Sequence, residues 1–386
     1  MFPSIVHRFY ANEIFHRIRL EPRISQRDIV ARTGFDKSTV SSIVNRFHEL
    51  GLIVRQPNSP QKRPGRPTEG LSISPHSGVL IGVQIDYGEL AFVVAGLDGQ
   101  PLESYSQPFS GKLRGLETTV AEGVQRIRAA SKRTGPVLGV GVSLPGLVNS
   151  AGVLVHAPIF GWRDVPMFDL LSKTISAPLY IGNDGKAGAM AEHMFGSCVD
   201  VKDFIYMFTG SGAGGAIVID GQIYRGTTGF AGELGHIKVV PRGRLCSCGA
   251  MGCLSAYVSS PALAAEINHL SGLSVQTFAE ILDRAKDGEE LIIDALDEAA
   301  EVIGSALASL INIFNPPLLV LGGDMSRAVS FLEPGVTRAL RRLAHPSMYA
   351  QTRVLFSELS AVKPYLGGIA LALDGVTGLD SSRVIP

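Results

Sequence analysis

Cysteine and tryptophan are scarce in this chain of 386 residues, which holds four cysteines and one tryptophan. So few cysteines in a chain of this length exclude a small disulfide-stapled scaffold. Charged residues make up only 18% of the chain and hydrophobic residues 45%, which excludes a disordered protein and a coiled coil. With 44 glycines and 22 prolines, the sequence indicates a loop-rich α/β protein of two or three domains.

Long uninterrupted hydrophobic segments are also lacking. The first ten residues contain a proline, a histidine and an arginine instead of the apolar core of a signal peptide. The longest uncharged stretch, residues 302–323, is broken by Asn312, Asn315 and the Pro316-Pro317 pair, which favours a helix and a following strand over a transmembrane helix. We therefore expect a soluble cytoplasmic protein without a membrane partner.

The net charge is zero, since 35 Lys and Arg balance 35 Asp and Glu, but it is unevenly distributed. Residues 1–70 hold 12 Lys and Arg against 6 Asp and Glu, and the remainder holds 23 against 29. The resulting charges of +6 and −6 predict an anionic partner for the amino-terminal part only. Nucleic acid is the leading candidate.

The first 50 residues have the pattern of a helix-turn-helix. Apolar spacing predicts one helix near residues 5–18, and further helices begin at the capping residues Ser25 and Asp36, with a turn at Thr33-Gly34 between them. The apolar stripe of the third helix leaves small polar and basic side chains on its other face, which could enter a major groove. These predicted DNA contacts are Lys37, Ser38, Thr39, Ser41, Ser42, Asn45 and Arg46.

Two short strands, at residues 52–54 and 71–73, predict a β-wing after the third helix. The loop between them is basic, and its Arg63 and Arg66 could contact phosphates or a narrow minor groove. A three-helix packing unit followed by a solvated basic linker would give a similar pattern. Because helices, wing and charge agree, we favour a winged helix-turn-helix DNA-binding domain over residues 1–75.

The rest of the chain, residues 76–386, repeats one α/β unit. Each copy has three consecutive strands with an Asp-Gly-Gln turn. The predicted strands are residues 79–85, 90–96 and 101–105, and then 204–208, 215–219 and 223–225. The repetition predicts two lobes around a ligand cleft, residues 76–195 with the C-terminal helix and residues 196–365.

One histidine and three cysteines form the strongest local pattern, namely His236, Cys246, Cys248 and Cys253. One imidazole and three thiolates complete a tetrahedral set for zinc and leave no position for a metal-bound water. We therefore expect a structural zinc ion as the cofactor. The alternative is that these cysteines are merely reduced and partly buried.

Two further pairs are candidate ligand contacts. Glu233 and His236 are three residues apart, so on one helical turn they could bind the same polyhydroxylated ligand. Asp184 follows an apolar strand, where it could take a proton from a hydroxyl group while Asn183 bonds a neighbouring one. The alternatives are a surface glutamate and an Asn-Asp-Gly turn. The glycine-rich residues 209–215 could cradle a phosphate or form a tight hairpin.

The segment Gly232-Glu233-Leu234-Gly235-His236, with the cysteine cluster that follows it, resembles the signature of the ROK family (repressors, open reading frames and sugar kinases). The resemblance extends from about residue 79 to the carboxyl end, and the helix-turn-helix resembles the extension of the family's transcriptional repressors. It implies an α/β fold with an N-terminal winged helix-turn-helix and a two-lobed body. The body would have the actin-like fold, which is also called hexokinase-like or ribonuclease H-like.

The resemblance also implies partners and site residues. Family regulators are homo-oligomers, here a homodimer or homotetramer, that bind operator DNA and respond to a sugar or sugar phosphate. By this resemblance Asn183, Asp184, Glu233 and His236 would contact the sugar, and His236 with the three cysteines would hold zinc. In kinase members the residue matching Asp184 is the general base.

This chain departs from the kinase pattern at three places. Gln84 and Asp86-Tyr87 stand where ATP-dependent members have an acidic residue and a glycine pair, and no threonine follows. A side chain and a negative charge there oppose a triphosphate, so we expect no catalytic residue and no ATP-dependent catalysis. Ser255 replaces a glutamate that contacts the sugar, and Ile159 replaces a polar asparagine.

The sequence therefore predicts a sugar-responsive transcriptional regulator, and more specifically a repressor of genes for carbohydrate uptake or catabolism. An ATP-dependent sugar kinase with a DNA-binding appendage, in which Asp184 is catalytic, is the alternative. A third interpretation is an interaction protein whose cleft is inert.

Overall fold

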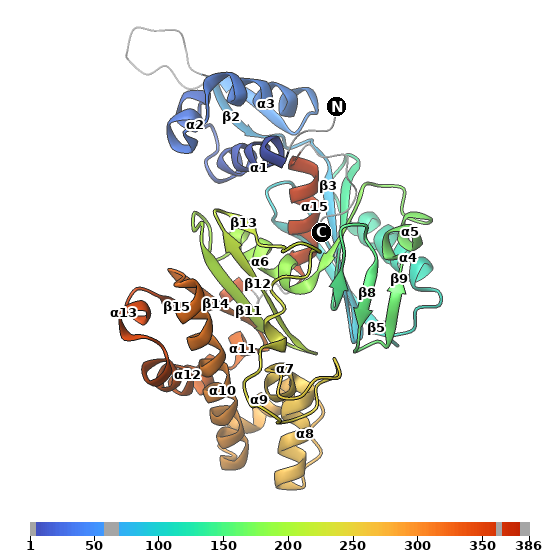
Figure 1. Ribbon diagram of the computed structural model, residues 1–386. Coiled ribbons are helices and arrows are strands. Elements are labelled where there is room, and N and C mark those ends of the chain that lie inside the picture. Colours follow the sequence, from blue (N-terminus) through green and yellow to red (C-terminus); the bar gives the residue numbers. More distant parts are fainter. Residues whose placement is uncertain (1–4, 58–68, 360–364, 379–386) are drawn as a thin grey trace.

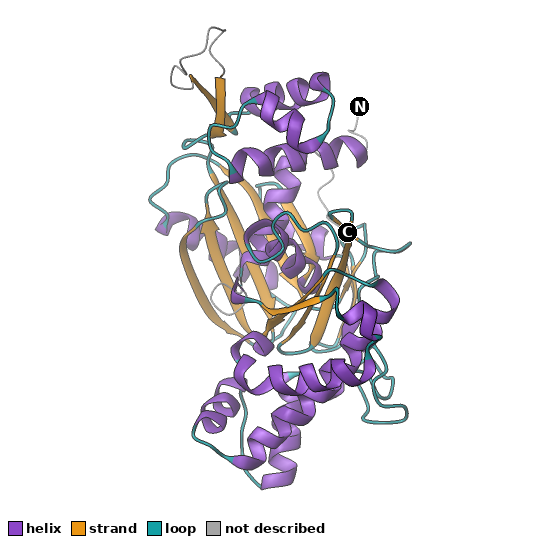
Figure 2. Cartoon of the chain, turned by 90° about the vertical axis from the view of Figure 1, so that its left-hand side faces the viewer, coloured by secondary structure: helices purple, strands orange, loops and turns teal. Residues whose placement is uncertain are grey.

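The chain forms an amino-terminal module and a two-lobed body in a computed structural model that describes residues 5–57, 69–359 and 365–378 (Figure 1). The module lies at one end of the molecule, two β-sheets lie in the middle, and a group of helices lies at the other end (Figure 2). In the part of the chain that the structure describes, no helix is both long and apolar enough to cross a membrane.

The amino-terminal module is a helix-turn-helix with a two-stranded antiparallel sheet, as predicted. Ser25 Oγ accepts a hydrogen bond from the backbone N–H of Asp28 at 3.2 Å, and Asp36 Oδ1 accepts one from that of Thr39 at 2.8 Å, so both predicted caps are present. The elements are α1 (Ile5–Leu20), α2 (Gln26–Thr33), α3 (Lys37–Glu49), β1 (Ile53–Pro57) and β2 (Glu69–Ile73). The predicted wing tip, with Arg63 and Arg66, lies outside the described residues.

The first lobe is a five-stranded sheet in the order β10-β6-β3-β4-β5, in which β3, β4 and β5 are antiparallel neighbours and β6 and β10 run parallel to β3. Its strands are β3 (Val79–Asp86), β4 (Gly88–Ala95), β5 (Pro101–Phe109), β6 (Val137–Leu144) and β10 (Leu179–Asn183). Helix α4 (Leu116–Ala130) packs on one face of this sheet.

The last described helix, α15 (Leu366–Thr377), covers the other face of the same sheet (Figure 1). It approaches the strands closely because Gly82 and Gly141 face it without side chains. A Cβ atom at Gly141 would lie 1.9 Å from the carbonyl oxygen of Gly368. The lobe that begins at β3 is therefore completed by the carboxyl end of the chain.

The second lobe repeats the first. Its sheet has the order β13-β12-β11-β14-β15, so that both sheets have the order 3-2-1-4-5 when their strands are counted along the chain. This shared order confirms the predicted duplication. The strands are β11 (Phe204–Thr209), β12 (Ala213–Ile219), β13 (Gln222–Ile223), β14 (Leu318–Gly323) and β15 (Arg353–Phe356). The main helices are α8 (Ser260–Ser271), α9 (Phe278–Lys286), α10 (Glu290–Phe314) and α12 (Val329–Leu343).

The third strand of this second unit is shorter than the predicted 223–225. Strand β13 ends at Ile223, and the chain then turns at Gly226, whose φ of +65° requires the left-handed region. Arg225 therefore lies outside the sheet. Residues 302–323 form the end of α10 and then β14, as predicted.

Helix α6 (Asp184–Phe195) lies between the lobes and packs against β10 in the first sheet and against β11 and β12 in the second. It also packs along α15. The remaining elements are short. They are β7 (Leu147–Val148), β8 (Leu154–Ala157), β9 (Trp162–Val165), α5 (Met167–Ser172), η1 (Leu234–His236), α7 (Ser255–Val258), α11 (Asp324–Arg327) and α13 (Pro346–Tyr349).

Candidate functional site

A cavity of about 840 Å³ lies between the two lobes. Its lining includes the four residues predicted to contact a sugar, Asn183, Asp184, Glu233 and His236. Two of them come from the first lobe and two from the second, so a ligand in this cavity would touch both lobes. The volume is in the range of known small-molecule sites.

Asn183 and Asp184 lie where β10 ends and α6 begins, which is the strand end that the sequence predicted and not an isolated turn. Asn183 caps the helix by accepting a hydrogen bond from the N–H of Lys186 at 3.1 Å, and its amide donates to the carbonyl of Gly146 at 3.1 Å. Burial raises the pKa of Asp184 to about 7, and the negative charges of Asp86 and Glu233 act in the same direction.

Glu233 directly precedes η1, and His236 ends it, so a single 3₁₀ turn carries both side chains to the cavity. Burial raises the pKa of Glu233 to about 7, although the positive charge of Lys186 opposes the shift. A cavity with two such carboxyl groups can accept hydrogen bonds from a polyhydroxylated ligand once the groups ionise.

The sequence analysis missed Lys186, which is buried in the first turn of α6. Its Nζ donates a hydrogen bond to the carbonyl of Gly229. Burial lowers the pKa of this lysine to about 8, with a further lowering by Arg225 and an opposing effect of Glu233. The available signal was a lone lysine among the small and apolar residues 185–191, where a buried charge requires a partner.

The glycine-rich residues 209–215 form a tight hairpin between β11 and β12, one of the two predicted structures. Thr209 pairs with Ala213, and Ser211 at the tip donates a hydrogen bond of 2.6 Å to Asp86 in the first lobe. Burial raises the pKa of Asp86, as do the charges of Asp324 and Glu89. Ser255 accepts a hydrogen bond from the N–H of Ala213 at 3.3 Å, so the residue that departs from the kinase pattern supports this hairpin.

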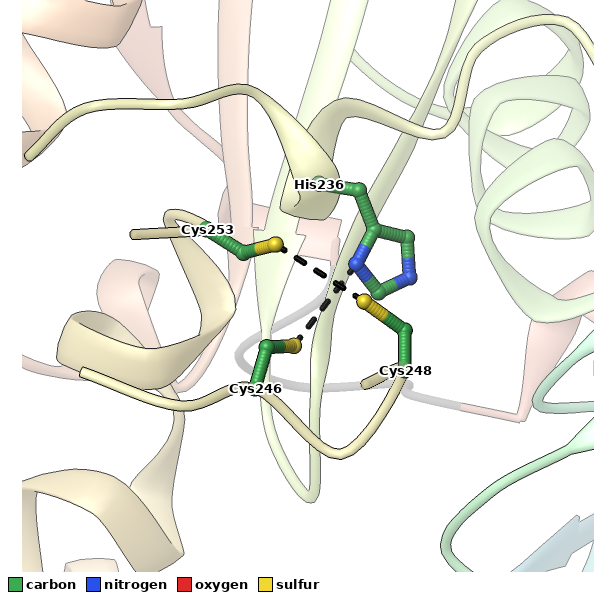
Figure 3. A group of neighbouring side chains, drawn as sticks. All are labelled: His236, Cys246, Cys248 and Cys253. Carbon is green, nitrogen blue, oxygen red and sulfur yellow. Dashed lines mark hydrogen bonds between the residues drawn. The ribbon is translucent and has the colours of Figure 1, made fainter. Parts of the chain in front are cut away.

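The predicted metal ligands are brought together beside the cavity (Figure 3). One ligand atom from each of His236, Cys246, Cys248 and Cys253 lies within 4.8 Å of all the others. His236 Nδ1 is 3.8 Å from Cys246 Sγ, and the sulfur atoms of Cys248 and Cys253 are also 3.8 Å apart. A tetrahedron with zinc–sulfur bonds of about 2.3 Å has edges of about 3.8 Å, so the set fits zinc.

The seven predicted DNA contacts of α3 are all at least partly exposed, whereas Val40, Ile43, Val44 and Phe47 on its other face are buried. Four of the seven already have side-chain partners: the hydroxyl groups of Ser38 and Thr39 each donate a 2.5 Å hydrogen bond to Asp36, Arg46 pairs with Glu49 at 3.3 Å, and Asn45 accepts a hydrogen bond. The sequence analysis missed Arg55 of β1, which donates a hydrogen bond to Asn45 and forms an ion pair with Glu69 of β2 at 3.4 Å. Arg55 thus links α3 to both strands.

Comparison with known proteins agrees with this architecture. Residues 80–375 match the protein-family model described as "ROK family", and residues 14–64 match the one described as "MarR family". The chain is 28% identical over 369 residues to a xylose repressor of Caldicellulosiruptor bescii, which covers 91% of this chain and 92% of the repressor.

Two solved structures have the same fold. One is a ROK family transcriptional regulator described as a homologue of the E. coli MLC protein, with a TM-score of 0.80, 24% identity and coverage of 97% of this chain and 98% of that one. The other is a ROK family glucokinase from Streptomyces griseus with glucose and AMPPNP, with a TM-score of 0.68 and 28% identity. It covers 76% of this chain and 99% of the glucokinase.

Proposed function

The chain belongs to the ROK family and is a regulator with a DNA-binding helix-turn-helix, and we propose that its binding to operator DNA responds to a sugar or sugar phosphate. One observation carries this proposal. A single cavity is lined by Asn183, Asp184, Glu233 and His236, and the same chain also has a helix-turn-helix. The similarity to a xylose repressor over 91% of the chain supports it. More specifically, we propose that the protein acts in the cytoplasm as a repressor of genes for carbohydrate uptake or catabolism.

The four side chains would bind sugar hydroxyl groups in complementary ways. The Asn183 amide is oriented by its bonds to Gly146 and Lys186, and the carboxylates of Asp184 and Glu233 would accept hydroxyl hydrogens. Because Asn183 and Asp184 belong to the first lobe and Glu233 and His236 to the second, a bound sugar would draw the lobes together. Closure of the lobes would move the module, because α1 is paired with Asp374 of the first lobe through Arg8 and with Asp200 of the second through Arg17.

We propose that His236, Cys246, Cys248 and Cys253 hold a structural zinc ion. The ion would crosslink the loop from residue 236 to residue 253, which has little regular structure of its own. Since Nδ1 of His236 faces Cys246 and the ring also lines the cavity, the other ring nitrogen would be available for a sugar hydroxyl.

We propose that the exposed face of α3, with Lys37, Ser41, Ser42, Asn45 and Arg46, reads the major groove. The hydroxyl groups of Ser38 and Thr39 would mainly hold the start of the helix against the DNA backbone. Arg63 and Arg66, which lie outside the described residues, would contact phosphates or the minor groove.

We further propose that the protein is a homodimer or homotetramer. Ile313 and Phe314 at the end of α10 and Leu343 at the end of α12 are 71%, 39% and 42% exposed. A hydrogen bond from the Asn312 amide to the Leu343 carbonyl brings the two helix ends together, and we take the three exposed apolar side chains there as one patch. Such a patch favours contact with a second copy.

A sugar kinase is the second candidate, because the raised pKa of Asp184 suits a general base. The carboxylate of Asp86 opposes it, since this group lies against the hairpin that would face the phosphates. We expect no ATP-dependent phosphorylation of any sugar. Phosphorylation that is abolished by Asp184→Asn would instead establish the kinase.

The test of the proposed function is selection of genomic DNA fragments on the full-length protein, with and without a panel of sugars and sugar phosphates. We expect specific fragments to bind in the absence of ligand and to be released by one compound. The Glu233→Gln variant should bind the same fragments and lose the response to that compound. Selection of the same fragments under every condition would refute a sugar response.

A further inference from the structure

A second cavity, of about 430 Å³, lies between the module and the body. One wall is α1, and the others come from α6 and α15 of the first lobe and from the β12–β13 hairpin and Arg225 of the second. None of the residues of the sugar site lines it. Any occupant would therefore contact the DNA-binding module and both lobes at once.

Arg225 is the group in this cavity that lacks a partner. Its side chain is partly buried and its guanidinium is accessible from the cavity, and it has no hydrogen-bond acceptor or ion pair at contact distance among the described residues. Burial lowers its pKa to about 10, so the group still carries a positive charge at neutral pH. A guanidinium without a contact partner in a partly enclosed, mainly apolar cavity can bind an anion through charge-assisted hydrogen bonds.

The acidic residues of the cavity do not fill this role. Asp374 of α15 is held by α1, because Arg8 forms an ion pair with it and the Asn12 amide donates a hydrogen bond of 2.5 Å. Glu13 is paired with Arg17 at 2.9 Å. Both carboxylates make their direct contacts with the module, and Asp374 acts on Arg225 only through its charge, which opposes the lowering of the Arg225 pKa.

His16 adds a second unsatisfied polar group to the same wall. Its Nδ1 accepts a hydrogen bond from Arg19 Nε at 3.3 Å, and its Nε2 is buried without any partner. Buried polar atoms of this kind are rare in proteins and often mark a missing ligand or water.

The rest of the wall is mainly apolar and includes Phe9, Met190, Met194, Val218 and Ile223. An inorganic ion would leave most of this surface without contact. A molecule with an apolar body and one anionic group matches both the volume and the lining.

We propose that this cavity binds a small organic anion, a carboxylate or a phosphate monoester, with the anionic group on Arg225 and the apolar part against α1 and α6. The guanidinium would form paired hydrogen bonds with either kind of oxyanion. The site is separate from the sugar cavity, and the proposal does not depend on the proposed sugar response.

The test uses three probes of similar size on the full-length protein: phenyl phosphate, benzoate and the neutral benzyl alcohol. Binding is measured by titration calorimetry. We expect phenyl phosphate, benzoate or both to bind, and benzyl alcohol to bind at least about tenfold more weakly. Preference between the two anions identifies the natural ligand as a phosphate monoester or a carboxylate.

Arg225→Gln should weaken binding of the preferred anion by about tenfold or more, because it removes a charge-assisted pair of hydrogen bonds. The exposed Arg341→Gln is the matched control and should leave the affinity unchanged. Ile223→Trp places a larger side chain in the cavity without removing a charge, so it should also abolish binding. This variant provides the test if Arg225→Gln does not fold.

Three results would overturn the proposal. The first is no binding of either anion, and the second is equal affinity for benzyl alcohol. The third is binding that Glu233→Gln abolishes and Arg225→Gln leaves intact, which would place the probe in the sugar cavity. That last result would leave the proposed function standing, so the two ideas fail separately.

Discussion

Asp184 owes its chemistry to its position between the lobes. Burial holds its proton, and the carboxylates of Asp86 and Glu233 make ionisation still less favourable, so its pKa lies near 7 and not near 4. A carboxyl group with this pKa is half ionised at neutral pH. Small changes in its surroundings would therefore change how it binds a hydroxyl group.

Affinity for the sugar effector should rise with pH up to about 7 and level off above it. Below this pKa, Asp184 is protonated and must lose its proton to accept a hydroxyl hydrogen fully, which costs up to tenfold in affinity per pH unit. Calorimetric titration from pH 5 to pH 9 measures this, and Asp184→Asn should make the profile shallower, leaving only the dependence due to Glu233, whose pKa is also raised to about 7. Affinity that falls with rising pH would contradict the role of the carboxylate.

Cys248→Ser should lower both the zinc content and the thermal stability of the protein. Loss of one ligand from a four-ligand set weakens metal binding, and metal binding stabilises the fold, so we expect a decrease in Tm of about 5 °C or more. Elemental analysis and a thermal scan measure the two effects. Cys198→Ser, at a buried cysteine outside the cluster, should leave the zinc content unchanged.

At the scale of the element, α3 carries its capping residues and the proposed base-contacting residues on one exposed face. Asp36 accepts hydrogen bonds from Ser38 and Thr39, which hold the pKa of its carboxyl group well below the usual range. Further along, Arg55 of β1 fixes the Asn45 amide. The first turn of α3 is therefore used for capping, and its middle carries the side chains that we propose for base contacts.

Asn45→Ala should change the preferred DNA sequence, whereas Arg66→Ala should weaken binding to all sequences and lower the salt dependence by about one counterion. Amide groups read base edges, but an arginine on a wing acts mainly on the backbone. Selection from a randomised operator library and salt titration measure the two effects. Arg341→Ala, far from the module on α12, should change neither, and an unchanged preference in Asn45→Ala would exclude base reading by that residue.

At the scale of the whole molecule, much of the architecture follows from local patterns. Local sequence patterns were enough to predict three features. These are the helix caps at Ser25 and Asp36, the repeated strand units and the cysteine cluster. Contacts between distant segments could not be predicted in this way. The bond from Lys186 to Gly229 and the ion pair from Arg8 to Asp374 depend on how helices dock, which local periodicity does not encode.

The apolar patch at the ends of α10 and α12 leads to a prediction about assembly. Ile313→Asp should convert the oligomer to a monomer, because a charge at a side chain that is 71% exposed would be buried without a partner in the interface. Sedimentation velocity measures this. Leu270→Asp, at an exposed leucine on α8, is the control and should keep the oligomer. An unchanged oligomer in Ile313→Asp would place the interface elsewhere.

Helix α15 also affects how the protein can be made. It follows every other described element in the chain, yet it fills the face of the first sheet and, through Asp374, holds α1 of the module. Until α15 has been synthesised, one apolar face of the first sheet stays uncovered, and the module is held only by its contacts with earlier residues such as Asp200. A nascent chain thus acquires its full contact between module and body only after α15 has been synthesised, and products terminated before α15 would lack it.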